Sequence, residues 1–101
     1  MERLLFVYSD NSLIGTLKKT DEGYEFCYLE GATQAISLTL PLRKEPYTSP
    51  TLFPFFDNLI PEGWALEEGI ALHALDRKDR FGLLAHLCQD CIGRCSIRRE
   101  L

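Results

Sequence analysis

Four of the five prolines in this chain fall within fourteen residues, at Pro41, Pro46, Pro50 and Pro54. Each proline lacks a backbone N–H donor, and each disfavours helical geometry in the residue before it. Residues 41–54 are therefore expected to have an irregular backbone. Because Tyr47, Leu52 and Phe53 can anchor this segment to a core, we expect an ordered connector between two differently folded parts.

The residues before the connector have the composition and spacing of strands. Segments 3–8, 13–19 and 24–29 are separated by the turn-forming runs "SDNS" and "TDEG". In "YEFCYL", the side chains of Tyr24, Phe26 and Tyr28 alternate with the others, which is the period of a strand. In the same way, segment 36–40 is predicted to point Ile36, Leu38 and Leu40 inward. Residues 1–40 therefore predict an antiparallel meander.

The residues after the connector change to a helical pattern. A short helix is expected around 54–58, and Pro61 has the fixed φ suited to the first position of a second helix that runs to about Leu75. Asp76 and Asp79 can cap a third helix, whose apolar residues Phe81, Leu84, Ala85 and Cys88 follow helical spacing. Segment 95–99 alternates again and can return to the sheet.

These patterns predict one α+β domain over residues 1–101. It consists of an antiparallel β-meander or partly closed barrel (1–40), the proline-rich connector (41–54), two to three helices (55–88) and a final strand (94–99). A chain of 101 residues is long enough to bury roughly 60–70% of the surface of its unfolded form.

Charge is distributed unevenly along the chain, whose formal net charge is −4. Residues 45–76 contain six acids and no lysine or arginine. This distribution argues against binding to DNA phosphates, which requires a basic face. The acidic segment is either a solvated face or a surface complementary to a basic partner.

The sequence contains no apolar run near the ~20 residues that span a membrane, and its start does not resemble a signal peptide. We therefore expect a cytoplasmic protein with reduced cysteines. Cys88, Cys91 and Cys95 resemble part of a metal cluster, but Cys27 lies on a predicted strand and the two histidines lack ligand spacing. No metal and no cofactor are expected.

Asp57 and Glu62 could form a carboxylate pair for acid–base chemistry. No nucleophile, phosphate-binding loop or metal ligand accompanies them, and acids near helix ends usually cap the helix or complement its dipole. The sequence therefore predicts no catalytic residue, and the protein is not expected to be an enzyme.

Trp64, the only tryptophan, is the most informative residue of the acidic segment. The helix after Pro61 is apolar nearly all round, interrupted by Glu67 and Glu68, so it is either buried on several sides or presents one face to a partner. Tryptophan is over-represented among interface anchors. Trp64 can be a core residue or such an anchor, and Gly69 in mid-helix indicates a close packing contact.

The chain resembles the N-terminal subdomain of HipA-type toxin kinases. The residues that carry this resemblance are, in order, "SLTLPL" (37–42), "FPFFDNLIPEG" (53–63), "DRFGLLAHL" (79–87) and "DCIGRCSI" (90–97). The most specific of them is "FFDNLIPEG". Two departures from the family pattern are Arg94 and "WALEEG" (64–69).

HipA kinases continue beyond this subdomain, whereas this chain stops at Leu101. The resemblance therefore implies a subdomain made separately, similar to the HipS subunits of split HipBST toxin–antitoxin systems. It implies an antitoxin that restrains a HipT-like kinase, together with a HipB-like DNA-binding protein and with no direct contact to nucleic acid or membrane. The alternative is an accessory subunit that completes or activates a split kinase. The predicted partner-binding residues are Pro61, Glu62, Gly63, Trp64, Glu67 and Glu68.

Overall fold

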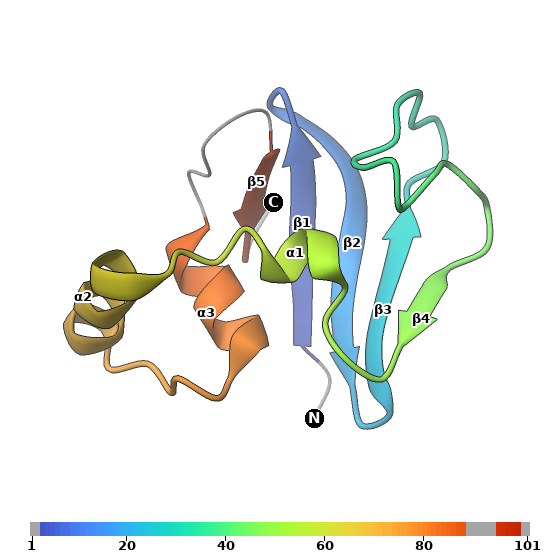
Figure 1. Cartoon of the computed structure of the whole chain (residues 1–101). Coiled ribbons are helices and arrows are strands. Elements are labelled where there is room, and N and C mark those ends of the chain that lie inside the picture. Colours follow the sequence, from blue (N-terminus) through green and yellow to red (C-terminus); the bar gives the residue numbers. More distant parts are fainter. Residues whose placement is uncertain (1–2, 89–94, 100–101) are drawn as a thin grey trace.

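The computed structural model describes residues 3–88 and 95–99. Its strands form one antiparallel sheet in the order β4-β3-β2-β1-β5 (Figure 1). The strand bounds are β1 Arg3–Ser9, β2 Ser12–Thr20, β3 Gly23–Tyr28, β4 Tyr47–Ser49 and β5 Cys95–Arg98. Within the described residues the two edge strands do not pair with each other, so the sheet is open and not a closed barrel.

The helices of the described part of the chain are α1 Pro54–Asp57, α2 Gly63–His73 and α3 Arg80–Leu87. α1 and α3 lie against one face of the sheet, whereas α2 projects to the side, beyond α3 (Figure 1). The prediction of an α+β fold with a meander, about three helices and a returning strand is confirmed.

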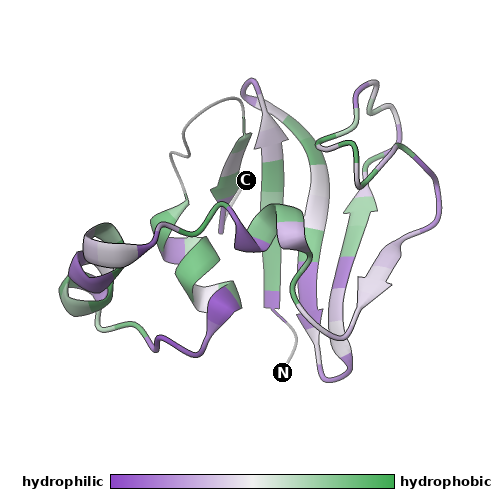
Figure 2. Cartoon of the chain, in the orientation of Figure 1, coloured by the Kyte–Doolittle hydropathy of each residue, from purple (hydrophilic) through white to green (hydrophobic). Residues whose placement is uncertain are grey.

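The core lies between the sheet and the two helices that cover it. Phe26 on β3 and Phe56 on α1 are completely buried, with ring centroids 5.2 Å apart. Phe81 of α3 and the inward residues of β1 and β2 complete the cluster. In Figure 2 the hydrophobic positions of the strands, α1 and α3 gather in this layer. The predicted inward faces of β3 and α3 are confirmed, since Tyr28, Leu84, Ala85 and Cys88 are all buried.

Segment 36–40 is not a strand, and its prediction was wrong. Only an isolated bridge joins Ser37 to Leu40, and Leu38 is fully exposed instead of pointing inward. The reason is a tight turn in which the Leu40 N–H donates to the Ser37 carbonyl oxygen (3.1 Å). The apolar residues do alternate in this segment, but its backbone groups form hydrogen bonds within the turn and not with the backbone of a neighbouring strand.

The fourth strand comes from inside the proline-rich connector. β4 occupies the three residues between Pro46 and Pro50, and it pairs with the β3 segment from Tyr24 to Phe26. Proline is tolerated at the margins of an edge strand because no neighbour requires its missing donor. The connector is ordered as expected, with Leu52 and Phe53 buried, but the prediction of an irregular backbone was wrong at β4.

Polar contacts fix α3 against the sheet. The Asp79 carboxylate accepts a hydrogen bond from the Gly82 N–H (3.1 Å), so the predicted N-cap is confirmed. The same carboxylate forms an ion pair with Arg3 of β1 (3.0 Å). None of the helices in the described part of the chain is long and apolar enough to cross a membrane.

Candidate partner-binding site

The chain enters α2 through a change of direction at Gly63. Ile60 is buried, Glu62 is extended (φ −119°, ψ 170°), and Gly63 has a φ of +61°, which glycine adopts without steric cost. Pro61 is therefore not the first helical residue, and that prediction was wrong. The left-handed glycine prevents the helix from starting earlier. Glu62 is the N-cap residue, but its side chain makes no capping hydrogen bond.

The outer face of α2 is exposed to solvent and carries the apolar residues Trp64 and Leu72 with Glu68 between them. Trp64 is 79% exposed and Leu72 is 76% exposed, and α2 has no fully buried residue. At 100° per residue, Glu68 and Ala71 lie within about 40° of Trp64 on the helix surface. Trp64 is therefore not a core residue of this domain, and its role as an interface anchor stays a prediction.

The inner face of α2 packs on α3. Leu66 and Ile70 are partly buried against the core cluster. A Cβ atom at Gly69 would lie only 2.7 Å from the Leu87 Cδ2 atom, so the close contact expected at this glycine is confirmed. α2 therefore packs against α3 and the core along one side only, and Trp64 lies on the opposite side.

The three acids of the predicted site differ in their surroundings. Glu67 forms a two-pronged ion pair with Arg77, which follows α2, and the Arg77 Nη2 to Glu67 Oε2 distance is 2.6 Å. Hydrogen bonding to this guanidinium lowers the pKa of the Glu67 carboxyl. Glu62 and Glu68 are exposed, and neither has an ion pair within the described residues. Only these two carboxylates are free to attract a basic partner.

Asp57, the other carboxylate considered for acid–base chemistry, also has an arginine partner. Its Oδ1 atom lies 2.8 Å from the Arg80 Nε atom, so this acid joins α1 to the start of α3. Two of the six acids in the segment 45–76 are therefore paired with arginines from the segment that follows it. The negative charge of the segment is smaller at the surface than the sequence indicates.

The cysteines occupy structural positions as far as they are described. Cys88 is completely buried, and its thiol donates to the Leu59 carbonyl oxygen (3.2 Å). Cys95 is buried in β5 and Cys27 is partly exposed on β3. Cys91 and Arg94 lie outside the described residues. Within residues 3–88 and 95–99, no three histidine, cysteine or acidic side chains gather as metal ligands would.

A histidine pair at the junction of α2 and α3 was missed by the sequence analysis. The rings of His73 and His86 stack with centroids 6.0 Å apart. The pKa of His86 is lowered, first by burial and then by the nearby charges of Arg99, His73 and Arg3. The two residues are thirteen positions apart, so only the packing of the two helices brings them together.

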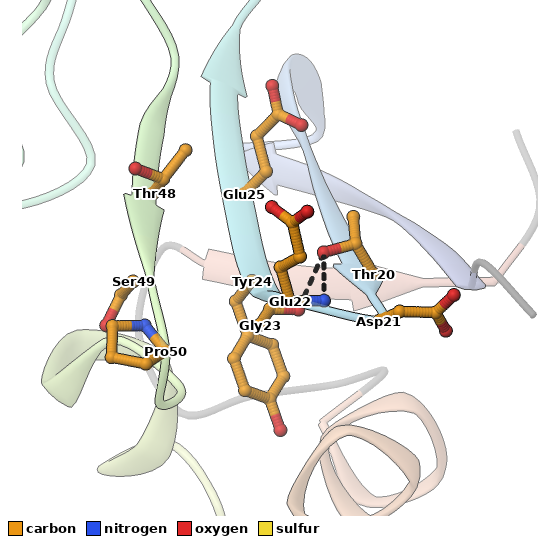
Figure 3. A pocket seen from close by; sticks show the side chains of 9 residues that line it. All are labelled: Thr20, Asp21, Glu22, Gly23, Tyr24, Glu25, Thr48, Ser49 and Pro50. Atoms are coloured by element: carbon orange, nitrogen blue, oxygen red, sulfur yellow. Dashed lines mark hydrogen bonds between the residues drawn. The ribbon is translucent and has the colours of Figure 1, made fainter.

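A hollow of about 560 Å³ lies far from α2, between the β2–β3 turn and β4 (Figure 3). Asp21, Glu22 and Glu25 line it, but their carboxylates diverge in Figure 3. The Thr20 hydroxyl accepts from the Glu22 N–H (3.2 Å) and bonds to the Gly23 carbonyl oxygen, which closes the turn. The outer face of α2 remains the better candidate site.

Comparisons with known proteins agree with this geometry. A model of the HipA N-terminal domain family matches residues 5–98. An uncharacterized protein of Haemophilus influenzae is 35% identical over 100 residues, which cover 95% of this chain and 90% of that protein. A solved structure of the N-terminal domain of HipA toxin matches with a TM-score of 0.77 and 33% identity, over 98% of this chain and 93% of that one. This chain belongs to the HipA N-terminal domain family.

Proposed function

We propose that this chain is a non-catalytic antitoxin, which binds a HipT-like serine/threonine kinase toxin and inhibits it. The single observation that carries the proposal is the 79% exposure of Trp64 on a helix face that the domain itself does not cover. Burying an exposed tryptophan in a partner gains a large apolar contact at a low cost in conformational entropy. Membership of the HipA N-terminal domain family indicates a kinase of that family as the partner.

In this mechanism the chain blocks the kinase and does not react with it. Trp64 inserts into a pocket of the kinase, while Glu62 and Glu68 face basic groups of its phosphate-binding cleft. Pro61 and Gly63 set the direction of α2, and Glu67 is paired with Arg77 within the chain. An occupied cleft cannot position a phosphoryl donor, so transfer stops without catalysis by this chain. A HipB-like DNA-binding protein completes the complex.

A second candidate function follows from the solved relative, which is a domain of the HipA toxin itself. The same fold can therefore serve as a part of a kinase. In this alternative the chain is an accessory subunit that completes or activates a split kinase. The sign of its effect on kinase activity separates the two functions, because an antitoxin lowers the activity and a completing subunit raises it.

Co-expression of the kinase and this chain in bacteria tests the proposal. The wild-type chain should restore growth, and Trp64→Ala should fail to do so although the protein accumulates. Leu4→Ala provides a matched control, since Leu4 is an exposed apolar residue on the sheet, distant from α2. Equal rescue by the wild type and Trp64→Ala would rule out Trp64 as the inhibitory group.

A further inference from the structure

The large hydrophobic side chains that are exposed lie in three parts of the chain within the described residues. Trp64 and Leu72 lie on α2, and Leu4 stands alone on β1. The other three, Leu29, Leu38 and Leu42, lie in the segment between β3 and β4, where Leu29 and Leu42 line one hollow. Isolated exposed hydrophobic residues are common, but a group of them marks an interaction surface. We name the group Leu29, Leu38 and Leu42 the loop patch.

Leu38 is held outward by a rigid turn. Its side chain is fully exposed, although it lies between hydrogen-bonded residues. The Thr39 N–H donates to the Ser37 hydroxyl oxygen (3.2 Å), and the Leu40 N–H donates to the Ser37 carbonyl oxygen. The turn therefore holds Leu38 in one direction, and a partner that binds it pays little entropy to order it.

Hydrogen bonds of the Tyr28 hydroxyl group attach this turn to β3. The buried Tyr28 hydroxyl accepts a hydrogen bond from the Ile36 N–H (2.9 Å) and donates to the Leu40 carbonyl oxygen. Leu40 itself is buried in the core. Burial raises the pKa of this phenol, which thus remains a donor under physiological conditions. A core tyrosine is therefore used to fix a loop whose outermost residue has no contact within the domain.

The outer face of α2 alone is too small to hold a kinase. An eleven-residue helix is about 16 Å long and 10–12 Å across, so half of its lateral surface is roughly 260–310 Å². Specific interfaces bury about 800 Å² on each partner. The kinase must therefore cover further surface of this domain, and the loop patch is the other concentration of exposed apolar side chains.

From these observations we infer that the loop patch is a second contact surface for the same kinase, with Leu38 as its anchor; the inference rests on the proposed function. α2 and the loop lie at opposite ends of the domain (Figure 1), whose longest dimension is 38 Å. A partner that contacts both ends must itself extend over a comparable distance, as a folded kinase does. The hollow beside Leu29 and Leu42 is also lined by Arg43, Lys44 and Glu30, so the matching kinase surface is apolar with a charged rim.

Affinity measurements with the purified kinase test the inference. Leu38→Ala should weaken binding about tenfold, the effect of losing roughly 1.4 kcal/mol of contact. Leu4→Ala removes a comparable side chain from the sheet and should leave the affinity unchanged. Because residues at opposite ends of the domain act independently, the fold losses of Leu38→Ala and Trp64→Ala should multiply in the double variant.

The fold of the free protein serves as an internal control. Leu38 touches nothing in the domain, so Leu38→Ala should keep the unfolding free energy of the wild type within about 0.5 kcal/mol. If Leu38→Ala binds the kinase with wild-type affinity, or if Leu4→Ala loses as much affinity as Leu38→Ala, the loop patch is not a contact surface for the kinase. Trp64→Ala decides the proposed function separately: if it too binds and inhibits like the wild type, the inhibitory site at α2 fails as well.

Discussion

Two aromatic residues eight positions apart illustrate how differently single residues are used in this domain. Phe56 is completely buried among other aromatic rings, whereas Trp64 is mostly exposed. Both residues are large and aromatic, and both lie near acidic residues in the sequence, Asp57 and Glu62. The left-handed turn at Gly63 separates the two residues, because the chain leaves the core there and enters α2. Phe56 lies before this turn and is buried, whereas Trp64 lies after it and is exposed.

This contrast predicts opposite effects on stability. Phe56→Ala should lower the free energy of unfolding by about 3–5 kcal/mol, because it removes a ring from the core and leaves a cavity. Trp64→Ala should change the same free energy by less than about 0.5 kcal/mol. Urea unfolding followed by circular dichroism measures both changes. A large loss of stability in Trp64→Ala would show that the tryptophan packs against its own domain.

At the scale of secondary structure, elements with a strong local signal could be predicted from the sequence. The β-hairpins of residues 3–28 have clear turns, and α3 has a capping aspartate followed by a helical stripe. Segment 36–40 could not be predicted because the Tyr28 hydroxyl, eight residues away, stabilises a turn there. β4 was hidden for the related reason that only its pairing with β3 makes three residues between prolines a strand.

The candidate site could be predicted only in part. Its place on α2 and the prominence of Trp64 follow from the sequence, since a helix that is apolar nearly all round is either buried on several sides or presents one face to a partner. Which face of α2 points to solvent could not be predicted, because it depends on the close packing of Gly69 against Leu87. The pairing of Glu67 with Arg77 also lay beyond sequence reasoning, as the chain turns back after α2 to make it.

The ion pair between Glu67 and Arg77 yields a prediction for α2. In the wild type, the pKa of the Glu67 carboxyl should lie below the ordinary glutamate value because Arg77 donates to it. In Arg77→Ala the pKa of Glu67 should return toward about 4.3, the value of an unperturbed glutamate. NMR titration of the side-chain carboxyl carbons measures it.

Lys78→Ala is the matched control for this titration, because it also removes one positive charge next to α2 but no hydrogen bond to Glu67. Its Glu67 should titrate as in the wild type. If both variants shifted the pKa of Glu67 equally, the general field of positive charge, and not the two-pronged contact, would be responsible.

For the whole molecule, the stacked histidines predict a dependence of stability on pH. The pKa of His86 is lower in the folded chain than in the unfolded chain, so the unfolded chain binds more protons near pH 6. The stabilising contribution of the neutral ring is therefore complete above about pH 6.5, the ordinary histidine value. It is lost as the pH falls through the lower folded pKa.

Unfolding free energies at about pH 7.5 and pH 5.5 measure this contribution, since these values lie on either side of the ordinary histidine pKa. The wild type should lose stability at the lower pH, and His86→Gln should lose less because its side chain does not titrate. An equal loss in both proteins would assign the effect to other groups. The ring of His86 stacks on that of His73 where α3 meets α2, so protonation of His86 should also loosen the helix that carries Trp64.

The domain as a whole thus combines a rigid sheet and core with a helix that is held along one side only. That arrangement suits a protein whose function is to present α2 to a larger partner. It also explains why the family relationship and the exposed tryptophan are both needed for the proposed function. In the proposal, the family membership supports a kinase as the partner, and the exposure of Trp64 supports α2 as the contact.

The most direct measurement is the rate of phosphoryl transfer by the purified HipT-like kinase as this chain is added in increasing amounts. Inhibition should rise to completion near one chain per kinase, and Trp64→Ala should require at least about 30-fold more protein, as expected for an interface anchor worth 2 kcal/mol or more. A rate that increases with added chain, or equal inhibition by Trp64→Ala, would contradict the account.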